Sequence, residues 1–228
     1  MAFSLVSNVT TTGGANGGTT AGIDTTGANL ITVVVPSYSG TAAPTLSDSK
    51  SNTYTGLTEQ VVIDNRLRMF YVLSPTVGGS HTFTVAGTDS FSSCIVAAWS
   101  GAAAFDQQNG ATAAGVSSLA TGSVTPSENN ELLVYGAMIN DVGDITAVDI
   151  GTLLDHFAGV DSVNFGCGFG YQIQTTATAR NPSFTGSGTF NMNAVIATFT
   201  AAAAGGATAG FGPLIGGQRN RHILNARA

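Results

Sequence analysis

The chain has 228 residues and a formal net charge of −6, because 7 lysines and arginines stand against 13 aspartates and glutamates. Charged residues make up 9% of the chain, whereas an ordinary soluble domain carries about 25%. So few cations exclude a protein that binds nucleic acid by neutralising phosphates, and a hydrophobic share of 43% excludes general disorder. The length fits one large all-β domain or two small ones.

The first predicted strand covers residues 30–35, a β-branched run that we expect to end at Pro36, because proline has no N–H for a ladder. Residues 67–73 are apolar on both faces, which is typical of a central strand. In residues 81–85, apolar side chains and His81 alternate with threonines, which indicates a half-buried strand.

Residues 91–99 place Trp99 in phase with other apolar side chains, which favours a position in the core. Further strands are predicted at residues 132–139, 163–173 and 190–199. In the second of these, aromatic and apolar residues alternate with glycines that let another backbone or sheet approach closely. Residues 150–157 also fit helical spacing, but Gly151 and Gly159 bracket a segment too short for a helix, so a strand is favoured.

Turn signals separate these short strands, and the pattern predicts an antiparallel, jelly-roll-like β-sandwich over residues 1–200. Residues 201–228 differ, because an Ala/Gly linker leads to a basic C-terminal arm. Its apolar and cationic side chains predict docking on an acidic neighbouring subunit, and a frayed terminus is the alternative. The predicted docking residues are Phe211, Leu214, Arg219, Arg221, Ile223, Leu224 and Arg227.

The sequence signals for a catalytic, metal-binding or glycan-binding site are weak. No serine stands in the Gly-x-Ser-x-Gly spacing of a hydrolase nucleophile, and the histidines form no metal-binding spacing with Cys94 or Cys167. Two acidic loops, at residues 48–52 and 141–149, offer oxygens for Ca²⁺, but structural turns explain such loops more often. Tyr54 and Trp99 are the candidate glycan contacts. We predict no catalytic residue, no cofactor and no metal.

Several segments resemble a β-sandwich pattern of structural and surface proteins in tailed bacteriophages and prophages. The stretch Asp48-Ser-Lys-Ser-Asn-Thr-Tyr54 matches D-S-x-x-N-x-Y, and residues 82–85 match T-x-T-V. Residues 99–102, followed by Asp106, match an aromatic residue with S-G-A and an Asp. The resemblance covers residues 30–200 and implies no catalytic residues.

The resemblance implies a non-enzymatic virion protein on the head or tail surface, such as a decoration, fibre or tail-associated subunit. It would be made in the host bacterial cytoplasm and would assemble through sheet faces and the arm. Other virion proteins and copies of the chain itself are the expected partners, without nucleic acid or membrane insertion. The alternative is a carbohydrate-binding module that recognises a host surface glycan. An enzyme stays open only because a Ser-His-Asp triad has no fixed chain order.

Overall fold

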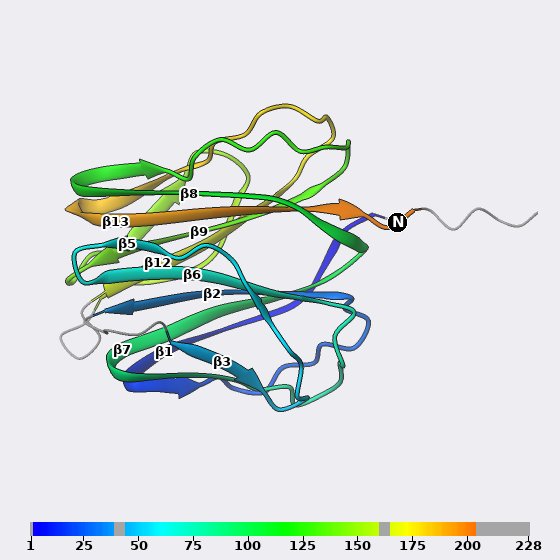
Figure 1. Ribbon diagram of the computed structural model, residues 1–228, viewed down its shortest axis with the longest axis horizontal. Coiled ribbons are helices and arrows are strands. Elements are labelled where there is room, and N and C mark those ends of the chain that lie inside the picture. Colours follow the sequence, from blue (N-terminus) through cyan, green and yellow to red (C-terminus); the bar gives the residue numbers. More distant parts are fainter. Residues whose placement is uncertain (1, 39–43, 160–164, 204–228) are drawn as a thin grey trace, which may run out of the picture.

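The computed structural model describes residues 2–38, 44–159 and 165–203. In these ranges the chain forms strands, turns and loops without a helix, and the strands make two antiparallel sheets stacked face to face (Figure 1). The predicted all-β sandwich is therefore confirmed. No helix in the described ranges is long and apolar enough to cross a membrane.

The first sheet has seven strands in the order β1-β7-β2-β6-β4, with β3 paired to β7 and β5 to β6. Their bounds are β1 Ser4–Thr19, β2 Leu30–Tyr38, β3 Thr45–Asp48, β4 Thr55–Gly56, β5 Gln60–Val62, β6 Asn65–Leu73 and β7 Phe83–Ser100. All pairs are antiparallel.

The second sheet has six strands in the order β10-β13-β9-β12-β11, with β8 paired to the other side of β13. Their bounds are β8 Ala102–Ala120, β9 Leu132–Asn140, β10 Ile145–Val148, β11 Thr152–Phe157, β12 Phe165–Ile173 and β13 Ser183–Ala201. The described strands of each sheet thus come from one half of the chain. In the described ranges the chain crosses from one sheet to the other once, at Gly101. The sandwich therefore has a simpler connectivity than the jelly-roll-like arrangement expected from the sequence.

The main core lies between the sheets. Its largest fully buried members include Trp99 from β7, Phe165 and Phe169 from β12 and Phe199 from β13. Aromatic side chains bury the most apolar area per residue, so these rings supply much of the attraction between the two layers. Cys167 lies in this core, as its alternation with Phe165 and Phe169 predicts.

Each sheet also has a covered outer face. On the first sheet, Cys94 and Val96 pack with Phe83 beneath loops that carry Ile23 and Tyr54. A second outer cluster on the other sheet contains Tyr135, Ile145 and Phe184. The central strands are therefore buried on both faces, which explains their nearly continuous apolar runs.

Three local expectations have clear outcomes. The strand predicted to end at Pro36 continues to Tyr38, because Pro36 pairs with Leu67 on β6 and the ladder to β7 skips it. Residues 152–157 form a strand, as favoured. The glycines of β12 do permit close approach, but the neighbours belong to this chain: a Cβ on Gly168 would meet Ile145.

Candidate functional site

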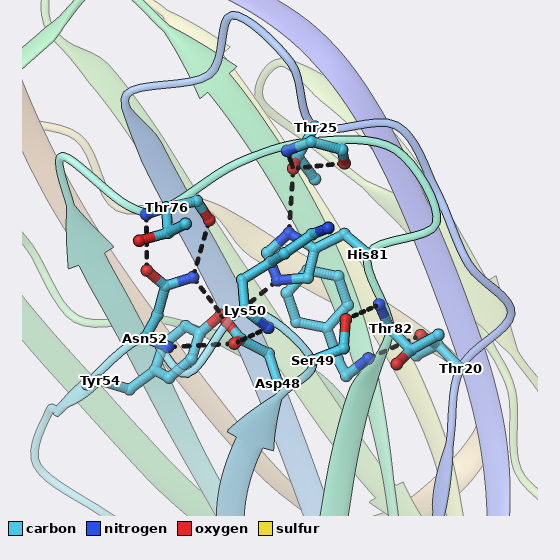
Figure 2. A network of polar contacts seen from close by, with 12 residues as sticks. Thr20, Thr25, Asp48, Ser49, Lys50, Asn52, Tyr54, Thr76, His81 and Thr82 are labelled. Carbon is cyan, nitrogen blue, oxygen red and sulfur yellow. Dashed lines mark hydrogen bonds and ion pairs between the residues drawn. The ribbon is translucent and has the colours of Figure 1, made fainter.

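The most connected polar cluster is built around Asp48, at the end of β3 (Figure 2). Oδ1 of Asp48 accepts hydrogen bonds from the backbone N–H groups of Lys50 and Asn52, at 2.9 and 3.1 Å. Oδ2 accepts from the side-chain amide of Asn52 at 2.8 Å and from the Tyr54 hydroxyl at 2.7 Å. An aspartate that binds the backbone two residues ahead fixes a tight turn, and the first Asp of D-S-x-x-N-x-Y has this role.

His81 extends the cluster into the interior. Its Nε2 lies 3.1 Å from Oδ2 of Asp48, and its Nδ1 lies 2.9 Å from Oγ1 of Thr25. The tautomer of the ring sets the direction of the contact with Thr25, because the Thr25 hydroxyl has the Gly78 carbonyl, at 3.2 Å, as a second acceptor. The ring also stacks on Phe83, with 4.4 Å between centroids.

The order Thr25–His81–Asp48 follows the logic of a catalytic triad, in which a base connects a hydroxyl to a carboxylate. However, Thr25 and His81 have no exposed surface, and neither does the side chain of Asp48. The Thr25 oxygen also accepts from the Gly78 N–H at 3.1 Å. A nucleophile must reach its substrate. The burial of all three groups therefore favours a structural role.

The same cluster joins three loops at one end of the first sheet. Asn52 donates to the Thr76 carbonyl at 3.0 Å and accepts from the Thr76 N–H at 2.7 Å. Ser49 Oγ accepts from the Thr82 N–H at 3.0 Å, and Thr20 Oγ1 accepts from the Phe83 N–H, also at 3.0 Å (Figure 2). The loops that follow β1, β3 and β6 are thereby held in one arrangement.

The electrostatics fit this role. Burial would raise the pKa of Asp48, but hydrogen bonds from Tyr54 and Asn52 and the contact with His81 outweigh it, so the pKa lies below its ordinary value. Burial, followed by the hydrogen bond to Asp48, raises the pKa of Tyr54 far above its ordinary value. The carboxylate therefore stays charged and the phenol stays protonated at neutral pH.

In both acidic loops, carboxylates that could bind Ca²⁺ are bonded to other groups of the protein. The Asp48 oxygens are occupied by donors from their own loop, as described above. In the second loop, Asp144 lies 2.9 Å from the His156 ring and Asp149 accepts from the Ser183 N–H at 2.7 Å. Within the described ranges, no three His, Cys, Asp or Glu side chains gather as a metal site would need. The contacts of Asp48, Asp144 and Asp149 instead hold the two loops as turns.

The two candidate glycan contacts, Tyr54 and Trp99, do not form an exposed aromatic surface on which a sugar ring could stack. Trp99 is fully buried, and its indole N–H donates to Thr32 Oγ1 at 2.9 Å. This burial contradicts a glycan contact at Trp99 and confirms the core position that its phase favours. Tyr54 is half-buried, packs on the outer cluster of the first sheet and gives its hydroxyl to Asp48.

A second polar cluster was missed by the sequence analysis. Glu131 is fully buried, and its Oε1 accepts from the Ser127 hydroxyl at 3.2 Å and from the Glu128 N–H at 2.8 Å. Ser127 also donates its N–H to Asp106 Oδ2 at 2.9 Å, and Thr198 donates to that same oxygen at 3.2 Å. Burial, and then the charge of Asp106, raises the pKa of Glu131. Only the folded chain brings these carboxyl groups together.

One pocket among the described residues has a volume of about 480 Å³, and none of the residues that line it is charged. Phe3, Asn129, Asn130, Ile173 and the end of β13 form its walls. The predicted docking residues of the arm, Phe211 to Arg227, lie outside the described ranges, so their role stays a prediction.

The fold and these clusters define a two-sheet antiparallel β-sandwich whose buried polar side chains fix loops. Comparison of the chain with protein-family models, curated proteins and solved structures finds no match in any of the three. Its function is therefore inferred from its own residues.

Proposed function

We propose that the chain is a non-enzymatic structural subunit of a tailed-bacteriophage particle, on the surface of its head or tail. The observation that carries this proposal is the position of the residues that resemble phage β-sandwich proteins. Asp48, Asn52 and Tyr54 of the D-S-x-x-N-x-Y stretch form one hydrogen-bonded turn. These residues of the resembling stretch therefore have a structural role, which is what the proposal expects of a pattern that specifies a fold.

The second part of the resembling pattern also has a structural role. Gly101 has a φ of 96°, which favours glycine, and a Cβ there would lie 2.5 Å from the carbonyl oxygen of Ala2. Asp106, the final residue of the pattern, accepts hydrogen bonds from Ser127 and Thr198. Both parts of the pattern thus fix the same sandwich, as a rigid shell component requires.

Assembly is assigned chiefly to the C-terminal arm. The outer faces of both sheets carry apolar clusters that are closed by strands and loops of the same chain, which leaves less sheet surface for a neighbour than the sequence suggests. Exposed apolar side chains remain at Ile63 and Val142, in the turns after β5 and β9. These two turns are secondary contact points in the proposal.

Purified particles test the proposal directly. Quantitative mass spectrometry of intact virions, with the major shell protein as the internal reference, should find this chain at a fixed, symmetry-related copy number. Absence from washed particles would overturn the proposal. A glycan array probed with the full chain examines the alternative, and specific binding that Tyr54→Ala abolishes, while the variant keeps the far-ultraviolet spectrum of the parent, would favour a carbohydrate-binding module.

A further inference from the structure

The two sheets have the same strand order. In the first sheet β7 pairs with β1 on one side and with β2 and β3 on the other, and β6 and β4 follow β2. In the second sheet β13 pairs with β8 on one side and with β9 and β10 on the other, and β12 and β11 follow β9. Each strand except β5 therefore has a counterpart, in the same chain order.

The registers of the central ladders also agree. Leu30 on β2 pairs with Trp99 and Leu73, whereas Leu132 on β9 pairs with Phe199 and Ile173. The next ladder repeats the match, because Thr55 pairs with Tyr71 and Thr152 with Tyr171. The counterpart pairs defined by these registers are Leu30 and Leu132, Tyr71 and Tyr171, Leu73 and Ile173, and Trp99 and Phe199.

Contacts between the sheets are exchanged reciprocally. The Tyr71 ring packs on Phe199 with 5.3 Å between centroids, and the Tyr171 ring packs on Trp99 with 5.0 Å. The two equivalent tyrosines thus contact the two equivalent aromatic residues Phe199 and Trp99, in each case across the halves of the chain. Reciprocal contact of this kind is the signature of a two-fold axis between two like units.

The axis itself can be located. Val34 pairs with Met69 and Ile95, and Gly136 occupies the counterpart position on β9. These two counterparts touch each other, since a Cβ on Gly136 would lie 2.7 Å from Cγ2 of Val34. Only residues beside a two-fold axis contact their own counterparts.

The edges of the two sheets also make reciprocal contacts between the halves of the chain. Thr10 on β1 donates to the Asp155 carboxylate on β11, in the other half. Gln108 on β8 accepts from the Thr58 N–H, just after β4, at 2.9 Å. In both places the first strand of one half is bonded to a residue on, or just after, the outer strand of the other half.

We propose that this chain is an internal duplication, in which residues 2–101 and 102–203 are two copies of one half-sandwich unit joined as a two-fold dimer would be. The apolar face of each copy is an interface whose partner is the other copy. Sequence divergence has concealed the repeat. The Asp48 network belongs to the first copy alone, because Val148 has the register position of Asp48.

The proposal explains the pocket beside the ends of the described chain. Asn29 holds the junction between the copies, because its side chain bonds both the N–H and the carbonyl of Ala102. The symmetric junction would run from Ala203 to Ala2, where the chain is not continuous. Both residues line the pocket of about 480 Å³. The pocket is therefore the open junction of the pair rather than a ligand site.

An exchange of counterparts tests the equivalence of the two copies. Trp99 has Leu5 as its neighbour on β1 and Thr32 as its hydrogen-bond acceptor, whereas Phe199 has Phe105 on β8 and Val134 at the position of Thr32. The exchange variant carries Leu5→Phe, Thr32→Val, Trp99→Phe, Phe105→Leu, Val134→Thr and Phe199→Trp in the full chain, so its composition is unchanged. Because the chain has one tryptophan, fluorescence reports on the transferred indole alone.

We expect cooperative unfolding and blue-shifted emission like that of the parent. The matched control carries Trp99→Phe and Phe199→Trp without the other four changes, so its indole has no threonine acceptor and crowds Phe105. This control should unfold at a lower temperature than the full exchange variant. Solvent-exposed emission or non-cooperative unfolding of the full exchange variant would overturn the equivalence.

A permuted chain tests the axis independently. Residues 102–203 come first, followed by a short glycine linker, residues 2–101 and then residues 204–228, so that all residues except Met1 are kept. We expect the far-ultraviolet spectrum, the tryptophan emission and the cooperative transition of the parent. A permuted chain that stays unfolded or aggregates under conditions where the parent refolds would count against the duplication.

Discussion

Val34 on β2 and Gly136 on β9 face each other between the sheets, and the valine occupies the space that a methyl group on the glycine would need. A Cβ on Gly136 would lie 2.7 and 2.8 Å from the two γ-carbons of Val34, well inside van der Waals contact. The spacing of the two layers at this point is therefore set by one small and one branched residue.

Gly136→Ala should lower the free energy of unfolding by about 1–3 kcal/mol, the usual cost of overpacking a core. Adding Val34→Ala should restore part of that loss, because the two side chains compete for one space. Urea unfolding of the two single variants and the double variant measures the coupling. Gly79→Ala is the control, since a Cβ there would meet nothing within 4 Å. Additive effects would show that the two residues do not limit each other.

Asp48→Asn should destabilise the protein by about 2–3 kcal/mol, because buried donors lose a charged acceptor. The substitution keeps the size of the side chain but not its capacity to accept from Asn52, Tyr54 and His81 together. Asp64→Asn, at an exposed position, should change the urea midpoint little. Equal effects of the two substitutions would contradict the structural role of the network.

The same pair of variants has a defined pH dependence. The folded pKa of Asp48 is lowered, so its stabilisation is present above the ordinary value of 3.8 and is lost as pH falls through the folded pKa. The difference in unfolding free energy between wild type and Asp48→Asn should therefore shrink in acid. A difference that stays constant down to the acid transition would mean that the carboxylate charge contributes nothing.

Glu131 should behave in the opposite way. Its folded pKa is raised, so its stabilisation is present below the ordinary value of 4.5 and is lost as pH rises through the folded pKa. Glu131→Gln removes the charge that burial and Asp106 disfavour, and it should raise the urea midpoint near neutral pH but not in acid. A lower midpoint at neutral pH would show that the charged form is the stabilising one.

Neither cysteine should react in the native state. Cys94 and Cys167 are buried, and burial raises the pKa of Cys94 to about 12. Because the thiolate is the reactive form, a chromogenic disulfide reagent should modify no thiol in the folded protein and both thiols in denaturant. Rapid labelling of one thiol without denaturant would reveal local opening around it.

Truncation after Ala203 should leave the thermal transition of the sandwich nearly unchanged while incorporation into particles falls. The last described strand ends at Ala201, and Ala202 is held by a 2.7 Å hydrogen bond from its N–H to the Gly101 carbonyl, so the ladders of the described ranges are formed by residues up to 202. Differential scanning calorimetry and particle purification measure the two effects. Normal incorporation of the truncated chain would support the frayed-terminus alternative.

Strongly apolar segments of the fold were predictable from the sequence. The runs at residues 30–35, 67–73 and 132–139 lie within β2, β6 and β9, because strands buried on both faces leave an unmistakable pattern. The long strands β1 and β8 were not predicted. Their threonines, glycines and alanines alternate only weakly, and they are ordered by pairing with β7 and β13.

The polar clusters depend on contacts that no local pattern contains. The alternation in residues 81–85 indicates a half-buried strand, and His81 is in fact buried in a bridge to Ile23 just before β7 begins. Its contacts with Asp48 at the end of β3 and with Thr25 in the loop after β1 could not be read from that alternation. Glu131 and Asp106 meet through Ser127 for the same reason. The repeat was also hidden, because counterparts such as Trp99 and Phe199 share size and burial rather than identity.

The division of the sheets between the two halves of the chain has a consequence for synthesis on the ribosome. All the hydrogen-bonded pairs of the first sheet are available once residue 101 has left the exit tunnel. Its inner face, with Trp99, Met69 and Leu30, stays uncovered until the strands of the second half emerge. Exposed apolar surface on a nascent chain attracts chaperones and invites aggregation. Codon choice and chaperone supply during translation of residues 102–203 should therefore influence the soluble yield more than the same factors do over the first half.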